Sequence, residues 1–170
     1  MDLKNYVRDI PDFPKPGILF RDITPLLAHP AAFSEVIDRF VNHYAGTPID
    51  AVAAAEARGF IFAAPLALRL NVGFVPIRKP GKLPGDTHRF EYDLEYGQDA
   101  LEVHTDGVKP GSRVLVVDDL LATGGTVDAC CRLIERAGAT VVGCAFVIEL
   151  AELGGAQRIA PRSVFRILSY

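Results

Sequence analysis

The residues most able to do chemistry lie in the stretch VLVVDDLLATGGTV, residues 114–127. An apolar run leads into two adjacent carboxylates, Asp118 and Asp119, and the chain then presents a glycine pair between two threonines. A glycine-rich turn that opens a helix binds anions, because its backbone N–H groups lie at the positive end of the helix dipole. We therefore predict that a single phosphate group binds the loop formed by Ala122, Thr123, Gly124, Gly125 and Thr126. Two negative side chains beside such a loop need a separate explanation.

The two aspartates suit the hydroxyl groups of a sugar. A carboxylate accepts two hydrogen bonds from vicinal hydroxyls, as the ribose-binding acid of dinucleotide-binding folds does. A phosphate loop with carboxylates close by thus describes a ribose 5-phosphate, and the acids bind the sugar or a metal ion that accompanies it. A Gly-Gly turn alone is more often only a turn, but the neighbouring aspartates favour a binding site. The motifs GxxxxGK[ST] and GxGxxG are absent, so the loop belongs to neither common class of nucleotide-binding loop.

Cationic side chains form a second group. Arg58 follows a short apolar run, and Arg78, Lys79 and Lys82 lie together in a segment punctuated by proline and glycine. The alternative interpretation of such a cluster is a solvated run of charges. A chain with a formal net charge of −3 that concentrates cations near its ligand-binding loops is nevertheless suited to a polyanion such as pyrophosphate.

Alternating apolar strands and amphipathic helices must position these residues. Runs that are apolar throughout are typical of a parallel sheet with both faces covered, in which ligands bind beyond the carboxyl ends of the strands. Three chemically rich stretches, residues 56–60, 78–85 and 118–126, leave their strands at that edge. The sequence predicts strands over 49–55, 72–77, 113–119, 141–150 and 163–168, helices over 30–45, 60–71 and 126–139, and a short helix within 1–10.

The composition restricts the class of protein. A length of 170 residues, of which 49% are hydrophobic and 23% charged, indicates one globular domain. The negative net charge provides no overall attraction to nucleic acid. Neither a signal peptide nor an apolar stretch of membrane-spanning length is visible, so we expect a cytoplasmic protein without a membrane partner. The three cysteines, two of them adjacent, do not form a disulfide framework and are expected to be buried thiols.

The motif over residues 114–126 resembles the signature of type I phosphoribosyltransferases, which bind phosphoribosyl pyrophosphate. Three further segments, residues 12–27, 56–62 and 77–97, resemble adenine phosphoribosyltransferases, and the similarity runs from Asp12 to about Gly155. The resemblance implies a single-domain α/β fold over 1–170, with a mostly parallel central sheet flanked by helices. It also implies a small base-binding hood at about 1–30 and a flexible lid loop. The implied reaction is magnesium-dependent and converts adenine and phosphoribosyl pyrophosphate into AMP and pyrophosphate, in a homodimer.

The resemblance also assigns roles to individual residues. Asp118 and Asp119 hold the ribose hydroxyls, with magnesium carried mainly by the substrate near them. The pyrophosphate lies near the cations Arg58, Arg78, Lys79 and Lys82, of which Arg78 and Lys79 act across a dimer interface. In the hood, the backbone of Leu19 matches the edge of adenine, while Phe20 and Arg21 define the base pocket.

The segment 82–96 shows no clear periodicity and is predicted to be a lid that excludes water from the reacting carbon. Glu95, near its end, resembles the acidic residue that manages a proton at the purine N7, and with Arg58 it is the predicted catalytic group.

Two alternatives stay open on the sequence alone. The first is an enzyme of the same fold that uses an oxopurine, which a lysine placed to donate to the purine O6 would favour. The second is a regulator that binds phosphoribosyl pyrophosphate without catalysis. A regulator needs a DNA-binding segment, and the sequence shows none.

Overall fold

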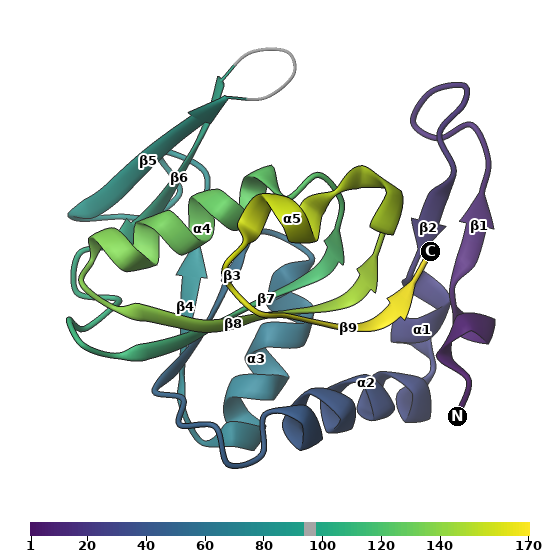
Figure 1. The fold of residues 1–170 in the computed structure, drawn as a ribbon, viewed down its shortest axis with the longest axis horizontal. Coiled ribbons are helices and arrows are strands. Elements are labelled where there is room, and N and C mark those ends of the chain that lie inside the picture. Colours follow the sequence, from purple (N-terminus) through teal and green to yellow (C-terminus); the bar gives the residue numbers. More distant parts are fainter. Residues whose placement is uncertain (94–97) are drawn as a thin grey trace. The chain divides into compact units, whose positions relative to one another are not determined.

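The computed structural model describes residues 1–93 and 98–170. Its contacts divide the chain into two compact units, Met1–His43 and Tyr44–Tyr170 (Figure 1). The predicted hood of about residues 1–30 falls within the first unit. The second unit contains the central sheet and the predicted phosphate loop.

The first unit consists of a small hairpin followed by two helices. Its elements are η1 (Leu3–Tyr6), β1 (Arg8–Ile10), β2 (Phe20–Asp22), α1 (Thr24–Ala28) and α2 (Pro30–His43). The helix α2 agrees with the helix predicted over 30–45. The regularly spaced apolar residues on which that prediction was based are buried. The short helix predicted within residues 1–10 is present only in part. Only one 3-10 turn forms there, and the chain then extends as β1 to pair antiparallel with β2.

The second unit is built on a parallel sheet of five strands in the order β4-β3-β7-β8-β9. Its strands agree with the five predicted runs: β3 (Ala51–Ala55), β4 (Gly73–Ile77), β7 (Arg113–Leu121), β8 (Thr140–Glu149) and β9 (Val164–Ser169). The central strands β7 and β8 are almost entirely buried, as expected for strands covered on both faces. The predicted α/β fold with a mostly parallel sheet is therefore confirmed.

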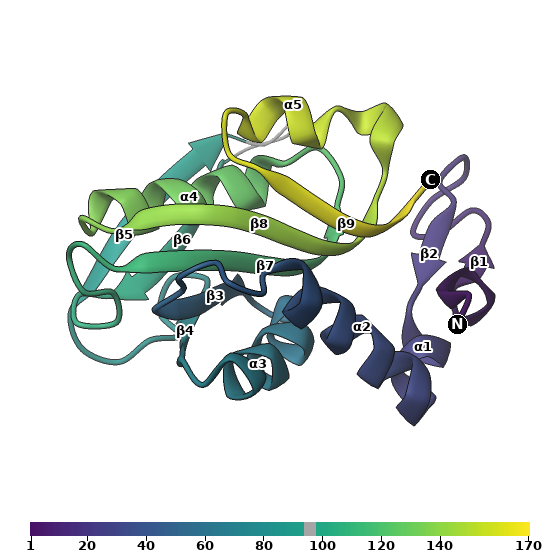
Figure 2. The same cartoon turned by 60° about the horizontal axis from the view of Figure 1, so that its bottom comes forward.

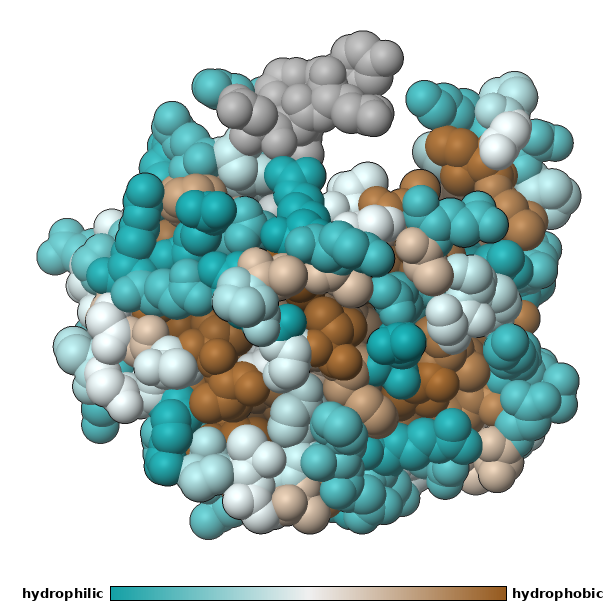
Figure 3. All heavy atoms as spheres, in the orientation of Figure 1, coloured by the Kyte–Doolittle hydropathy of each residue, from teal (hydrophilic) through white to brown (hydrophobic). Residues whose placement is uncertain are grey.

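Helices cover both faces of this sheet. In Figures 1 and 2, α3 (Gly59–Leu70) lies on one face, while α4 (Gly125–Arg136) and the short α5 (Gly155–Ile159) lie on the other. A 3-10 turn, η2 (Ala151–Leu153), precedes α5. The outward side of α4 and α5 is largely hydrophilic in Figure 3, as the amphipathic pattern of α4 requires.

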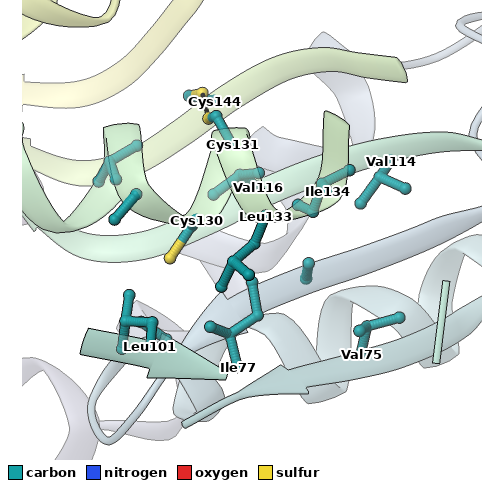
Figure 4. Close-up of a cluster of buried hydrophobic side chains, with 14 of the residues drawn as sticks. Val75, Ile77, Leu101, Val114, Val116, Cys130, Cys131, Leu133, Ile134 and Cys144 are labelled. Carbon is teal, nitrogen blue, oxygen red and sulfur yellow. Dashed lines mark hydrogen bonds between the residues drawn. The ribbon is translucent and has the colours of Figure 1, made fainter. Parts of the chain in front are cut away.

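The inner side of α4 forms much of the core. Figure 4 shows Cys130, Leu133 and Ile134 of α4 in one cluster with Val116 of β7 and Ile77 of β4. The three cysteines are all free and buried, in agreement with the prediction. The Cys131 and Cys144 sulfur atoms lie 3.7 Å apart within this apolar cluster.

The predicted lid differs from the structure. Much of the segment 82–96 was expected to be an unpatterned loop, but β5 (Thr87–Asp93) pairs antiparallel with β6 (Gln98–His104). Phe90 and Tyr92 lie two positions apart on β5 and pack against the core cluster, with the Arg136 guanidinium 4.6 Å from the centre of the Phe90 ring. This alternation of aromatic and polar residues is a strand signal that the sequence analysis missed.

Residues 94–97, which include Glu95, lie outside the described residues. Among the residues that are described, no helix combines the length and the apolar character needed to cross a membrane.

Candidate active site

A cavity of about 600 Å³ opens at the carboxyl ends of β3 and β7 in the second unit. It is lined by residues 56–58 after β3, by residues 118–127 at the end of β7 and the start of α4, and by Arg158 of α5. The edge of a parallel sheet beyond its strand ends is where α/β folds bind ligands. The structure thus brings together Arg58, Asp118, Asp119 and the predicted phosphate loop.

The phosphate loop is shaped by a glycine in a conformation that other residues avoid. Gly124 has a φ of +82° and precedes the first turn of α4. Among the described residues, no side chain caps this end of α4, so the loop leaves backbone donors of the first turn available to an anion. The predicted anion-binding geometry is therefore present.

The start of α5 packs directly against the backbone of the phosphate loop. A Cβ atom on Gly155 would lie 2.3 Å from the Ala122 carbonyl oxygen, and one on Gly124 would lie 2.9 Å from the Gly155 carbonyl oxygen. Such distances leave no room for any side chain at either position. The two backbones therefore approach more closely than any pair of non-glycine residues could.

The two aspartates have different environments. Asp119 is buried and forms an ion pair with Arg58, with 2.6 Å between the Asp119 Oδ2 and the Arg58 Nε. The Asp118 carboxylate accepts a hydrogen bond of 2.8 Å from the Asp119 backbone N–H. Burial and the neighbouring Asp119 carboxylate raise the pKa of Asp118 well above its usual value. Asp118 lines the same cavity, and the Arg58 guanidinium also attracts its carboxyl group, which partly opposes the rise in its pKa.

Glu56, which the sequence analysis did not select, organises the predicted pyrophosphate cations. Its Oε1 accepts a 2.8 Å hydrogen bond from the Lys79 backbone N–H and lies 3.4 Å from the Arg78 Nε. Its Oε2 forms an ion pair with the Lys82 Nζ. Burial opposes the charge on Glu56, but the hydrogen bonds from Lys82 and Lys79 prevail and lower its pKa. Glu56 therefore links the segment after β4 to the cavity.

The hairpin of β5 and β6 also contacts the site. The Lys79 Nζ lies 3.2 Å from the Asp99 Oδ2, and the Tyr92 hydroxyl donates a 3.4 Å hydrogen bond to the same atom. Burial raises the pKa of Tyr92, whose hydroxyl also interacts with the side chain of Thr126 in the phosphate loop. The base of the hairpin is thus connected to both the predicted phosphate and pyrophosphate residues.

The residues predicted to bind the base belong to the other unit. Leu19, Phe20 and Arg21 belong to the unit Met1–His43. There Leu19 is exposed, the Phe20 ring lies 5.1 Å from the Phe13 ring, and Arg21 pairs with Asp9 at 2.5 Å. Their role in base binding stays a prediction, as does the catalytic role of Glu95.

The buried charge of Asp118 predicts a pH-dependent stability. Because its pKa is raised in the folded state, the folded protein binds more protons than the unfolded chain between pH ~4 and the raised pKa. Stability therefore falls as the pH rises through this window. We expect Asp118→Asn to be more stable than the wild type at pH 8 in metal-free buffer, with the difference disappearing near pH 4.

Thermal unfolding of both proteins, followed as a function of pH, measures this difference. Asp106→Asn, which lies at an exposed turn, is the control. A less stable Asp118→Asn at pH 8 would contradict it.

The contact between Gly155 and Ala122 predicts a cost for the smallest side chain. Gly155→Ala must displace either α5 or the phosphate loop, and we expect the free energy of unfolding to fall by about 1–3 kcal/mol. Gly73→Ala is the matched control, because a Cβ there meets no atom within 4 Å, and it should change stability by less than about 0.5 kcal/mol. Chemical denaturation of both variants gives the comparison. Equal stabilities would mean that the loop yields freely.

Comparison with known proteins agrees with this geometry. The phosphoribosyl transferase domain model matches residues 22–168. The adenine phosphoribosyltransferase of Rhodopirellula baltica is 64% identical over all 170 residues and 82% of its own length, and that of Chloroflexus aurantiacus is 59% identical over 99% of this chain and 98% of its own.

Solved structures give the same result. The crystal structure of adenine phosphoribosyltransferase from Thermoanaerobacter pseudethanolicus has a TM-score of 0.96 at 49% identity, covering 99% of this chain and 98% of that one. The Saccharomyces cerevisiae enzyme, complexed with an imino-altritol bisphosphate and adenine, has a TM-score of 0.93 at 40% identity, covering 98% and 97%. With these matches along its whole length, the chain belongs to the adenine phosphoribosyltransferase family.

Proposed function

We propose that this protein transfers the phosphoribosyl group of phosphoribosyl pyrophosphate to N9 of adenine, releasing AMP and pyrophosphate. The observation that carries the proposal is that an anion-binding loop, the Asp118 carboxyl group and the Arg58 guanidinium line one and the same cavity. The full-length relatives named adenine phosphoribosyltransferase support the choice of base. The reaction places the protein in purine salvage.

The sugar phosphate is proposed to bind with its phosphate at the loop and its ribose at the aspartates. The 5-phosphate binds residues 122–126 at the start of α4, where backbone N–H groups and two threonine hydroxyls act as donors. The ribose hydroxyls then reach Asp118 and Asp119 at the end of β7, and Arg58 offsets the charge of Asp119. This arrangement keeps the carboxylates away from the phosphate itself.

Pyrophosphate competes for cations that acids of the same chain already hold. Glu56 pairs with Lys82 and lies beside Arg78, while Asp99 pairs with Lys79. These ion pairs are partly exposed and individually weak, so a polyanion can recruit their cations at small cost. Holding the cations in place beforehand reduces the side-chain entropy lost when pyrophosphate binds.

Glycosyl transfer develops positive charge on C1 of the ribose as the bond to pyrophosphate breaks. Water would capture that carbon, so the site must be closed to solvent during the reaction. We assign this role to the predicted lid, residues 82–96, and we assign the proton at the purine N7 to Glu95. Leu19, Phe20 and Arg21 are proposed to recognise the base.

The reaction is proposed to require magnesium. The carboxylate oxygens of Asp118 and Asp119 are the hard donors that this ion prefers, and both residues line the cavity. Magnesium bound to phosphoribosyl pyrophosphate would neutralise charge on the leaving group. We further propose a cytoplasmic homodimer, in which Arg78 and Lys79 act across the dimer interface. Three free buried thiols suit a reducing compartment.

A panel of bases tests the proposed function. The purified protein is mixed with magnesium and phosphoribosyl pyrophosphate, and nucleotide formation is followed with adenine, hypoxanthine, guanine and xanthine. We expect AMP alone to form at a useful rate. Products from the oxopurines would overturn the assignment of Leu19, Phe20 and Arg21 but keep the sugar-phosphate site. Tight binding of phosphoribosyl pyrophosphate without any product would favour the regulator.

The proposed proton transfer by Glu95 predicts a specific kinetic pattern. Glu95→Gln keeps the shape of the side chain but removes its basicity, so kcat should fall by about 10²–10⁴-fold while the affinity for phosphoribosyl pyrophosphate stays within a few-fold. Glu91→Gln is the control, because Glu91 is an exposed acid on β5 that pairs with Arg89 at 3.0 Å. Equal losses of kcat and affinity in Glu95→Gln would argue against proton transfer.

A further inference from the structure

Arg158 lines the same cavity as the phosphate loop, although it comes from α5, a helix that the sequence analysis did not predict. A Cβ atom on Gly125 would lie 3.5 Å from the carbon and from both terminal nitrogens of the Arg158 guanidinium. The whole guanidinium group therefore lies over the first residue of α4. The backbone N–H groups of the first turn of α4, which are available to an anion, start at that residue.

The position of Arg158 is fixed by close backbone packing rather than by its own side-chain contacts. Gly155, at the start of α5, approaches Ala122 and Gly124 so closely that neither glycine could carry a side chain. Arg158 lies three residues further along α5, on the same side of that helix. The Cβ of Arg158 lies 3.4 Å from the place that a Cβ atom on Gly124 would occupy. The guanidinium is therefore anchored to the loop through the helix.

The charges around the loop require a cation at this place. A phosphate monoester carries between one and two negative charges near pH 7. The loop itself supplies neutral donors, and the acidic residues Asp118 and Asp119 line the same cavity. Of the two arginines that line the cavity, Arg58 is engaged with Asp119. Arg158 is the one that can offset the phosphate.

The pairing of Arg158 differs from that of its neighbours. Arg132 and Arg162 on the same side of the sheet form ion pairs with Asp128 or Glu135. Within the part of the chain that the structure describes, no carboxylate lies within ion-pair distance of Arg158. An arginine held over an anion-binding loop without a carboxylate partner has its donors available for a ligand.

From these contacts we infer that Arg158 binds the 5-phosphate of the substrate and of the AMP product, together with residues 122–126. The inference rests on the proposed function for the identity of the sugar phosphate. Arg158 closes the side of the phosphate that the backbone of the loop leaves open. It contributes to binding equally in the substrate and in the transition state, because the 5-phosphate does not change its charge during glycosyl transfer.

Calorimetric titration of matched ligands tests the inference. Wild type, Arg158→Met and Arg158→Lys are each titrated with AMP, adenosine and ribose 5-phosphate. We expect Arg158→Met to bind AMP and ribose 5-phosphate about tenfold more weakly, as for one lost charge-assisted hydrogen bond, and adenosine with unchanged affinity. Arg158→Lys should recover most of the loss. Arg132→Met, which removes an exposed arginine of α4 outside the cavity, should match the wild type.

Kinetics supply an independent readout. In Arg158→Met the KM for phosphoribosyl pyrophosphate should rise by about the same factor, while kcat stays within about twofold, because only uniform binding is lost. An unchanged affinity for AMP, or an equal loss for adenosine, would overturn the role of Arg158.

Failure of the proposed function gives a different result. If the wild type binds ribose 5-phosphate but not AMP, the base assignment fails, and a loss of ribose 5-phosphate affinity in Arg158→Met still supports the inference. A wild type that binds neither ligand overturns the phosphate site and Arg158 with it.

Discussion

Two carboxylates and an anion-binding loop share the end of one strand, and the ion pair between Arg58 and Asp119 allows them to coexist. Without that guanidinium, β7 would end in two adjacent negative charges, one of them buried, directly before a loop that must attract a phosphate. The pair neutralises the charge of Asp119, and the Asp118 carboxyl group lines the same cavity. Arg58 reaches Asp119 only because β3 and β7 are neighbours in the sheet, so the topology of the fold determines the electrostatics of the site.

The same logic extends outward from the strand ends. Glu56 leaves β3 beside β4, where it holds the backbone of Lys79 and the side chain of Lys82. Three ion pairs, Arg58–Asp119, Lys82–Glu56 and Lys79–Asp99, therefore join acids and cations from different segments across the edge of the sheet. A binding site organised in this way remains folded without its ligand. The cations of these pairs can exchange partners when an anionic ligand arrives.

Much of this fold could be predicted from the sequence, because the strands of the parallel sheet are largely apolar and α2 and α4 each have one apolar face. The motif around Asp118 was equally visible, since its residues are contiguous. The roles of Glu56 and Arg158 could not be predicted from the sequence. They depend on which strand lies beside β3 and on how closely α5 packs against the loop. The hairpin of β5 and β6 was missed for another reason. Its alternating pattern is short and interrupted by charges, and its stability comes from packing against α4.

The order of strands in the sheet also affects how the chain can fold during synthesis. β7 stands at the centre and pairs with β3, whose first residue precedes the start of β7 by about 60 positions, and with β8, which follows it. Until the ribosome has released β7, the apolar strands β3 and β4 lack their central neighbour. Contacts between such distant segments form slowly and lower the folding rate. At about 5–20 residues per second, the chain between the start of β3 and the start of β7 takes several seconds to emerge, and the apolar segments are exposed to aggregation during that time.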